Sequence, residues 1–416
     1  MDLSGLLEPW NPWWDIGEIP ISLRGIERDV LYLVKQWINS TKKVKCIIGP
    51  RRSGKTTLLY QLIDVIIKTY SPTSAIYVNF DDPEISEYSL KDVISAAKRI
   101  SGGKTFLFLD EIQRVRNWER WLKALLDRES KVSVFISGST LSMLSKNFSK
   151  KLAGRSLTFF VYPFSILEAA RASGINWKDP RDMERLVGLV ENILEFGLYP
   201  EIFLEKDPNK KKRFLLEYYN TIVARDIAAA NELDIHICEN LAKLLFKNAG
   251  SRTSVNKLSK LLKVSFHTAN AYVNAFLSAF VLFEVRKFSY SFKEQIAFPR
   301  KFYPIDVAFQ RLFLPYTPDY GRRFESFVAS ELFKAGYSLY YFLNKRECDF
   351  VLEYENQIKH VLQVCYKLTK ENKARELEGL KAAEKEFSVE GNIIEFNANG
   401  IKYLLNLLSK NAKVFI

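Results

Sequence analysis

The sequence predicts an α/β fold that opens with a parallel β-sheet flanked by helices, and three observations support this prediction. A glycine-rich loop, residues 49–56, joins an apolar run typical of a buried strand (44–48) to a helical pattern that begins at residue 57. A second apolar run, 105–109, ends at two carboxylates, Asp110 and Glu111. Strand and helix patterns alternate up to residue 161, the order that gives parallel strands joined by helical crossovers. A ligand would bind at the carboxyl ends of such strands.

The glycine-rich loop meets the phosphate-loop pattern in full, and the strand and helix beside it are the context that the motif requires. Its glycines let backbone N–H groups turn toward a phosphate, and the N-terminus of the helix adds partial positive charge. Lys55 would contact the β- and γ-phosphates, and Thr56 would place its hydroxyl on Mg²⁺. The sequence therefore predicts an ATP site. Its residues are Gly49, Pro50, Arg51, Arg52, Ser53, Gly54, Lys55, Thr56 and Thr57.

Asp110 and Glu111 have the Walker B arrangement, since they follow an apolar strand that comes roughly fifty residues after the loop. Asp110 would join the Mg²⁺ shell, and Glu111 can polarise a water for attack on the γ-phosphate. Two acids after a strand can also cap the next helix. Beside a phosphate loop, however, the pair indicates ATP hydrolysis.

Two more strand patterns belong to the same sheet. Residues 75–79 end at the polar Asn79 and are followed by an acidic turn, and residues 132–136 end at the run 137–140. The nucleotide would bind at the carboxyl ends of these strands.

Length and composition bound the class of protein. The chain has 416 residues, enough for two to four domains. It has no run of eighteen apolar residues, and its first fifteen residues carry tryptophans and acids instead of a basic and then apolar segment, so neither a membrane span nor secretion is expected. The four cysteines and three histidines are scattered, which argues against disulfides or a zinc site and favours a reducing cytoplasm. The net charge of +13 suggests a polyanionic partner.

Much of this charge lies in residues 251–293, which hold seven basic residues against one acid. Here a helical pattern over 253–262 is followed by a turn, a second helix capped by Ser265, and a strand near 281–288. This is the order of a winged helix, whose second helix enters the DNA major groove while the wing follows the phosphates. Winged helices also bind proteins, so a protein partner is the alternative. The DNA-binding candidates are Arg252, Lys257, Lys263, His267, Asn270, Arg286 and Lys287.

Together these motifs resemble those of the archaeal and bacterial AAA+ ATPases of the AAA-14 type, a group of P-loop proteins. Besides the two Walker motifs, the resemblance includes residues 77–83, 136–139, 153–155 and 199–201, and it extends over most of the chain. It implies an AAA+ sheet with a helical lid, followed by a winged helix and a degenerate nuclease-like domain.

The same resemblance implies roles for single residues near the nucleotide. Ser139 would be the sensor that touches the γ-phosphate or the attacking water, and Asn79 would restrain Glu111. Pro200, in the turn 196–200, would contact the adenine base, although an ordinary turn between helices explains this pattern nearly as well.

An arginine finger is also implied. Arg155 lies just before an apolar strand pattern, 157–161, where AAA+ proteins often present an arginine to the neighbouring subunit, and Arg225 is a second candidate. A finger neutralises charge on the transferring phosphoryl group and is worth about 10³-fold or more in rate. A homo-oligomer would then complete the site.

The C-terminal pattern looks like the restriction-endonuclease fold, in which a helix Glu, a strand Asp and a Glu-x-Lys pair gather a metal. Glu325 and Asp349 fit this scheme, but Gln363 and Cys365 stand where the second carboxylate and the lysine are needed, and Lys367 is two residues too far on. With so few carboxylates, binding of Mg²⁺ and cleavage are both disfavoured.

The expected organisation is an aromatic N-terminal segment (1–20), an AAA+ ATPase core (21–163), a helical lid (164–245), a winged helix (246–295) and a nuclease-like domain (296–416). The expected function is a Mg²⁺-dependent, oligomeric ATPase whose nucleotide cycle governs how the winged helix engages DNA. A signalling switch that uses the C-terminal modules to bind a protein is the first alternative. An ATP-dependent nuclease is the second.

Overall fold

The computed structural model of the chain describes residues 3–139, 152, 154–313 and 319–411, and it divides into two compact units, Met1–Tyr162 and Pro163–Ile416. The five expected segments, including an ATPase core that ends at residue 163, stay predictions. Among the described residues, no helix is long and apolar enough to cross a membrane.

Unit 1 is built on a five-stranded sheet with the order β2-β3-β4-β1-β5, and every pair of neighbours is parallel, as the sequence predicts. From β1 the chain crosses to the far edge at β2, returns through β3 and β4, and then adds β5 on the other side of β1. The strands are β1 (Val44–Ile48), β2 (Ala75–Asn79), β3 (Thr105–Asp110), β4 (Val132–Gly138) and β5 (Ser156–Phe160).

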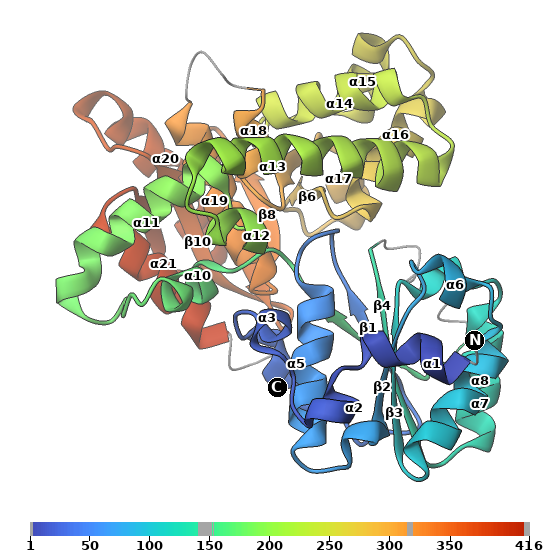
Figure 1. The fold of residues 1–416 in the computed structure, drawn as a ribbon. Coiled ribbons are helices and arrows are strands. Elements are labelled where there is room, and N and C mark those ends of the chain that lie inside the picture. Colours follow the sequence, from blue (N-terminus) through green and yellow to red (C-terminus); the bar gives the residue numbers. More distant parts are fainter. Residues whose placement is uncertain (1–2, 140–151, 153, 314–318, 412–416) are drawn as a thin grey trace. The chain divides into compact units, whose positions relative to one another are not determined.

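Helix α5 covers one face of this sheet, and α7 and α8 cover the other (Figure 1). Strands β1, β3 and β4 are buried along their whole length, which explains why most of their residues are apolar. Lys45 on β1 and Ser133 on β4 are polar exceptions, and the Lys45 ammonium donates to the Ser133 hydroxyl at 2.6 Å. The helices of unit 1 are α1 (Leu3–Leu7), α2 (Trp13–Ile16), α3 (Ile21–Arg24), α4 (Val30–Lys35), α5 (Lys55–Ile67), α6 (Pro83–Ser86), α7 (Leu90–Ser101) and α8 (Trp118–Arg128).

The aromatic N-terminal segment satisfies the free edge of the sheet. Strand β2 is an edge strand, so one row of its backbone groups has no strand partner. The indole N–H groups of Trp13 and Trp14 both donate to the carbonyl of Ala75, each at 3.0 Å. The buried Asn11 side chain accepts from the backbone N–H of Tyr77 at 2.7 Å and donates to its carbonyl at 2.9 Å. The segment therefore takes the place of a further strand.

Unit 2 begins with helices and continues with a mixed α/β part. Its helices are α10 (Ile166–Ala172), α11 (Met183–Phe196), α12 (Pro200–Leu204), α13 (Pro208–Thr221), α14 (Ile235–Lys247), α15 (Val255–Leu262), α16 (Phe266–Ser278), α17 (Phe292–Ala297), α18 (Ala308–Arg311), α19 (Tyr320–Lys334), α20 (Lys370–Phe387) and α21 (Ala398–Asn411). Helix α13 continues directly into a wider π-helical turn, Ile222–Ala228.

A six-stranded sheet with the order β11-β10-β9-β8-β6-β7 forms the rest of unit 2. Strand β6 changes partners along its length, because residues 282–285 pair with β7 and residues 286–287 pair with β8. The expected boundary at residues 295/296 thus falls between two strands of one sheet. The strands are β6 (Leu282–Lys287), β7 (Lys301–Pro304), β8 (Ser338–Leu343), β9 (Glu347–Tyr354), β10 (Gln357–Cys365) and β11 (Gly391–Glu395).

Candidate functional site

The phosphate loop links the end of β1 to the start of α5, and its backbone is shaped for a close turn. Arg52 and Gly54 have positive φ angles of 65° and 96°. A Cβ on Gly49 would lie 1.9 Å from the carbonyl oxygen of Val161, so glycine is required where the loop passes the end of β5. The N-terminus of α5 then points its first backbone N–H groups into the loop, which is the arrangement that binds phosphate.

Lys55 is buried beneath the loop, and its ammonium donates to the carbonyls of Gly49 at 3.1 Å and Pro50 at 2.9 Å. Arg28 supports the loop from outside, since its guanidinium donates to the Ser53 carbonyl at 2.6 Å. These contacts within the protein hold the loop in its curved form.

The remaining predicted loop residues lie around this turn. Arg51 is half-buried and Arg52 is exposed. Thr57, in the first turn of α5, packs so close to Gly25 that a Cβ there would meet its methyl group at 2.8 Å. Thr57 therefore helps to place the segment before the sheet against the loop.

Thr56 and Asp110 join the two Walker motifs. The Thr56 hydroxyl donates to Asp110 Oδ2 at 2.7 Å, and the Tyr77 hydroxyl donates to the same oxygen at 2.7 Å. The other oxygen, Oδ1, accepts from the Ser137 hydroxyl and from the Glu111 backbone N–H. Burial and the Asp110 carboxylate raise the pKa of Tyr77, so its hydroxyl stays protonated and donates. Donors from four residues therefore fix a buried carboxylate.

Glu111 follows Asp110 in a left-handed conformation with φ 53°, an unusual backbone for a residue with a side chain. Its backbone N–H lies 3.2 Å from the Ser137 oxygen, and its carboxylate accepts from the Gln113 amide. Burial raises the pKa of Glu111, and Lys55 opposes the shift. A carboxylate with a raised pKa is a better proton acceptor than an ordinary one.

The side chain that contacts the Glu111 carboxylate in this structure is Gln113, and a restraining role for Asn79 stays a prediction. Asn79 directs its amide oxygen to the backbone N–H of Asp81 at 3.0 Å, whereas Gln113 is the side chain that donates to Glu111. The reason is local, because the short helical turn after Glu111 brings Gln113 back over it.

Ser139, the expected sensor, is buried just beyond the end of β4. The serine that touches Asp110 and Glu111 is Ser137, two residues earlier. Strands β3 and β4 are parallel with Leu109 opposite Ile136, so the next pair in this register is Asp110 and Ser137. Tyr77 was also missed, although it lies on the neighbouring strand two residues before Asn79, which pairs with Asp110.

The two finger candidates lie in different units. Arg155 precedes β5, at the amino end of the parallel sheet, and its guanidinium is paired with Asp127 while both side chains are partly exposed. Arg225 is exposed on the π-helical turn of unit 2. Neither position tests the finger assignment, which concerns a second subunit.

Pro200 is the first residue of α12, and the turn before it is held within unit 2. Asp306 accepts the backbone N–H of Leu198 at 2.7 Å, and Gly197 leaves room for that carboxylate, since a Cβ would lie 1.9 Å from it. Tyr199 is fully buried in the helical core. These contacts explain the turn as packing, and contact with adenine stays a prediction.

The DNA-binding candidates fall into two groups. Lys257, Lys263 and His267 are exposed on or beside α15 and α16, and Asn270 is half-buried on α16. The others are engaged inside unit 2: Arg252 pairs with Glu347, Arg286 pairs with Glu284, and the ammonium of Lys287 lies 3.7 Å from the centre of the Phe298 ring.

The residues at the Walker motifs fit Mg²⁺, which prefers oxygen ligands and is usually held by one or two carboxylates together with substrate phosphates. The Thr56 hydroxyl and the Asp110 carboxylate supply such oxygens side by side. No cluster of three or more His, Cys, Asp or Glu that could hold a metal alone occurs within the described residues. The site therefore suits a metal that arrives with a nucleotide.

Comparisons with known proteins agree with this geometry. A family model described as an AAA domain (AAA_14) matches residues 41–170, and one described as a domain of unknown function (DUF8612) matches residues 188–318. The second match spans both expected boundaries of the winged helix, at 245/246 and 295/296. The parallel sheet, the phosphate loop and the Walker B pair define unit 1 as an AAA+ P-loop ATPase domain.

The chain belongs to the same family as the uncharacterized protein MJ1544 of Methanocaldococcus jannaschii, with 32% identity over 383 residues that cover 86% of this chain and 83% of the relative. An uncharacterized protein of Haemophilus influenzae is 27% identical over 342 residues, or 79% of this chain and 84% of that protein.

Solved structures are more distant. The Walker-type ATPase PABY2304 of Pyrococcus abyssi has a TM-score of 0.46 at 12% identity, covering 69% of this chain and 95% of that chain. The ORC1 protein of Aeropyrum pernix in complex with DNA has a TM-score of 0.34 at 12% identity, covering 73% and 96%. Likenesses this distant carry no information on the partners of this chain.

Proposed function

We propose that this protein is a Mg²⁺-dependent ATPase. The observation that carries the proposal is the 2.7 Å contact between the Thr56 hydroxyl and the Asp110 carboxylate, which brings the two Walker motifs together beside Glu111. A structural role alone would not require a buried lysine, a hydroxyl and two carboxylates to meet at the carboxyl edge of a parallel sheet.

Each residue has a role in this proposal. Lys55 exchanges the loop carbonyls for the β- and γ-phosphates of ATP, and Thr56 and Asp110 hold Mg²⁺, which neutralises phosphate charge when bound. Glu111 orients a water in line with the γ-phosphate and accepts its proton. The Ser137 hydroxyl fixes the positions of Asp110 and Glu111 by hydrogen bonding to both.

Two variants test the ATPase assignment. Glu111→Gln should bind ATP with near-normal affinity and hydrolyse it roughly 10²- to 10⁴-fold more slowly, because the amide cannot accept a proton. Lys55→Ala should lose ATP binding, measured with a fluorescent nucleotide. Glu87→Gln, on an exposed position of the same unit, is the matched control and should change neither quantity. Normal turnover in the Glu111 variant would refute the assignment.

We also propose that the ATPase cycle governs DNA engagement through the segment formed by α15, its turn and α16. Lys257 and Lys263 are exposed there, His267 lies in the first turn of α16, and residues 251–293 carry a strong excess of basic residues. Phosphate contacts by this surface would release counterions, so affinity should fall steeply with salt.

A DNA titration across salt concentrations tests this second part. Replacing Lys257 and Lys263 together by alanine should reduce the slope of log K against log salt by about 1.8, since each phosphate contact contributes about 0.9. Lys287→Ala is the control, because that ammonium is engaged with Phe298. A flat salt dependence for the unaltered protein would instead favour the signalling switch that binds a protein.

The proposed homo-oligomer rests on an arginine finger and has its own test. If Arg155 leaves Asp127 to reach the site of a neighbouring subunit, the specific ATPase rate should rise with protein concentration. Arg155→Ala should then remove this rise, and mixing it with Glu111→Gln protein should restore part of the activity. A specific rate that is independent of concentration would remove the finger from the proposal.

A further inference from the structure

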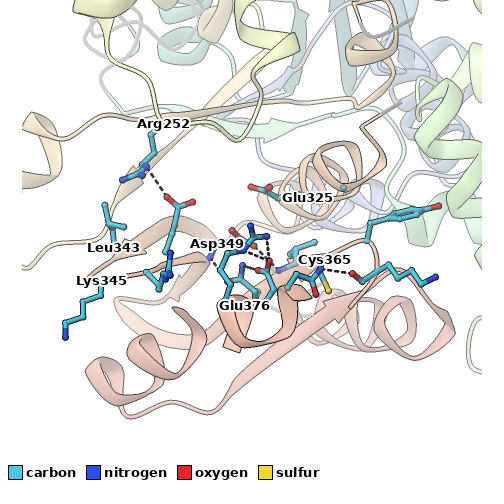
Figure 2. A pocket seen from close by; sticks show the side chains of 16 residues that line it. Arg252, Glu325, Leu343, Lys345, Asp349, Cys365 and Glu376 are labelled. Atoms are coloured by element: carbon cyan, nitrogen blue, oxygen red, sulfur yellow. Dashed lines mark hydrogen bonds and ion pairs between the residues drawn. The ribbon is translucent and has the colours of Figure 1, made fainter. Parts of the chain in front are cut away.

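Unit 2 contains a pocket of about 560 Å³ that the ATPase proposal does not use. It brings together the positions that the sequence links to a nuclease-like fold: Glu325 on α19, Asp349 on β9, and Gln363 and Cys365 on β10. Figure 2 shows Asp349, Glu376 and Cys365 close to one another, with Glu325 across the pocket from them. In a metal-dependent nuclease, carboxylates grouped in this way hold a divalent cation.

Here a lysine from another strand lies among the carboxylates. The ammonium of Lys301, on β7, is 2.7 Å from Glu347 Oε1, 3.4 Å from Glu325 Oε1 and 3.8 Å from Asp349 Oδ1. Its side chain is only 2% exposed. An ammonium offers three donors and no acceptor, so a buried one is best placed among several carboxylate oxygens. The change of partners by β6 brings β7 to this position.

Glu325, Asp349, Gln363 and Glu376 also have other protein partners. The Tyr303 hydroxyl donates to Glu325 at 2.6 Å. Asp349 Oδ2 accepts the backbone N–H of Val364 at 3.0 Å, and the Gln363 amide donates to Glu376 at 2.5 Å. An amide at position 363 satisfies Glu376, whereas a second carboxylate there would repel it.

A divalent cation does not fit this arrangement. Mg²⁺ needs oxygen ligands at about 2.0–2.1 Å in a near-octahedral set that keeps several waters. Glu347 and Glu325 instead accept from the Lys301 ammonium, and Asp349 lies 3.8 Å from it, so the positive charge of Lys301 would repel a second cation in the same place.

We propose that Lys301 is a built-in substitute for the divalent cation, so that this carboxylate pocket binds neither Mg²⁺ nor Mn²⁺ and has no metal with which to activate a water. This inference concerns unit 2 alone and is independent of whether unit 1 hydrolyses ATP. It also explains why positions 363 and 365 hold Gln and Cys instead of a carboxylate and a lysine. A pocket that already holds its cation needs neither another metal ligand nor a lysine beside a metal-bound water.

Mn²⁺ titration of the full-length, nucleotide-free protein tests the proposal, with binding followed by electron paramagnetic resonance. Lys301→Met removes the ammonium but keeps much of the side-chain volume, and it should gain one Mn²⁺ site per chain relative to the unaltered protein. Adding Asp349→Asn to this variant should remove the gained site. Lys345→Met, at the exposed mouth of the same pocket, is the matched control and should gain none. The Walker residues are identical in all four proteins, so their contribution cancels.

Thermal unfolding gives a second readout. Mn²⁺ should raise the melting temperature of unit 2 in Lys301→Met protein and leave it unchanged in the unaltered protein, since a ligand stabilises only the state that binds it. If Lys301→Met does not fold, the comparison of the unaltered protein with Asp349→Asn decides, and their Mn²⁺ titrations should coincide. A weaker titration of Asp349→Asn, or no gain in folded Lys301→Met, would overturn the proposal.

Discussion

Replacing Ser137 by alanine tests how the ATPase site is held together. The Ser137 hydroxyl donates to Asp110 Oδ1 and accepts the Glu111 backbone N–H, so one oxygen positions both Walker B residues. A hydrogen bond to a charged group contributes about 1.5–3 kcal/mol. If this stabilisation is lost where the carboxylates must be aligned for attack, kcat should fall about 10- to 150-fold. The KM for ATP should change little, because Lys55 and the loop are untouched.

The assay compares kcat and KM of three serine variants with melting temperatures measured in parallel. Ser139→Ala should keep a kcat near that of the unaltered protein, because the hydrogen bonds to Asp110 and Glu111 come from Ser137. Ser133→Ala, on the same strand, removes a contact to Lys45 at 2.6 Å and should lower stability without a selective loss of kcat. Normal kcat in Ser137→Ala together with a large loss in Ser139→Ala would refute this reasoning and support the sensor that the sequence predicts.

Three further outcomes are expected in unit 1. Gly49→Ala should abolish ATP binding and lower the melting temperature, because its Cβ would lie 1.9 Å from a backbone oxygen that cannot move away cheaply. The acid limb of the kcat profile against pH should lie above the usual carboxylate range, because burial raises the pKa of Glu111 and hydrolysis is lost as pH falls through that value; a limb at ordinary carboxylate pH would contradict this. Asn11→Ala should lower the free energy of unfolding by roughly 2–4 kcal/mol in urea, because it leaves the buried N–H and carbonyl of Tyr77 without their partner; Asn11→Asp should be at least as destabilising, because it would bury a carboxylate against the carbonyls of Tyr77 and Leu7.

The sequence predicted the sheet of unit 1 well because its central strands are buried on both faces. Such strands are mostly apolar in sequence, and the polar residues after them mark the carboxyl edge. The phosphate loop and Asp110 could also be identified, because the residues of each motif are contiguous in the sequence. The winged helix and the nuclease-like fold stay predictions.

The contacts that join separate strands could not be read from the sequence. Choosing Ser137 over Ser139 requires the register between β3 and β4, which no local pattern records. Gln113 was overlooked because its position over Glu111 depends on a single left-handed residue. Lys301 lies 48 residues before Asp349, and only the path of β6 and β7 brings the two together.

The aromatic N-terminal segment matches no functional motif, because its role is to hydrogen-bond to the backbone groups at the free edge of β2. Tryptophan and asparagine side chains can supply donors and acceptors to an edge strand, but the need for them arises only once β2 is known to be at the edge. The loss of stability expected for Asn11→Ala measures how much this edge pairing contributes.

The shared strand β6 limits how this protein can be dissected. The polypeptide passes from α16 through β6 with only three residues between them, and the same strand is hydrogen-bonded to both β7 and β8. A recombinant fragment that ends at residue 295 would strip β6 of both partners and leave an open, aggregation-prone edge, while a fragment that starts at 296 would leave β7 without its neighbour. Studies of either half in isolation would therefore report on a damaged sheet, whereas a cut after Tyr162, where the two compact units divide, leaves both sheets whole.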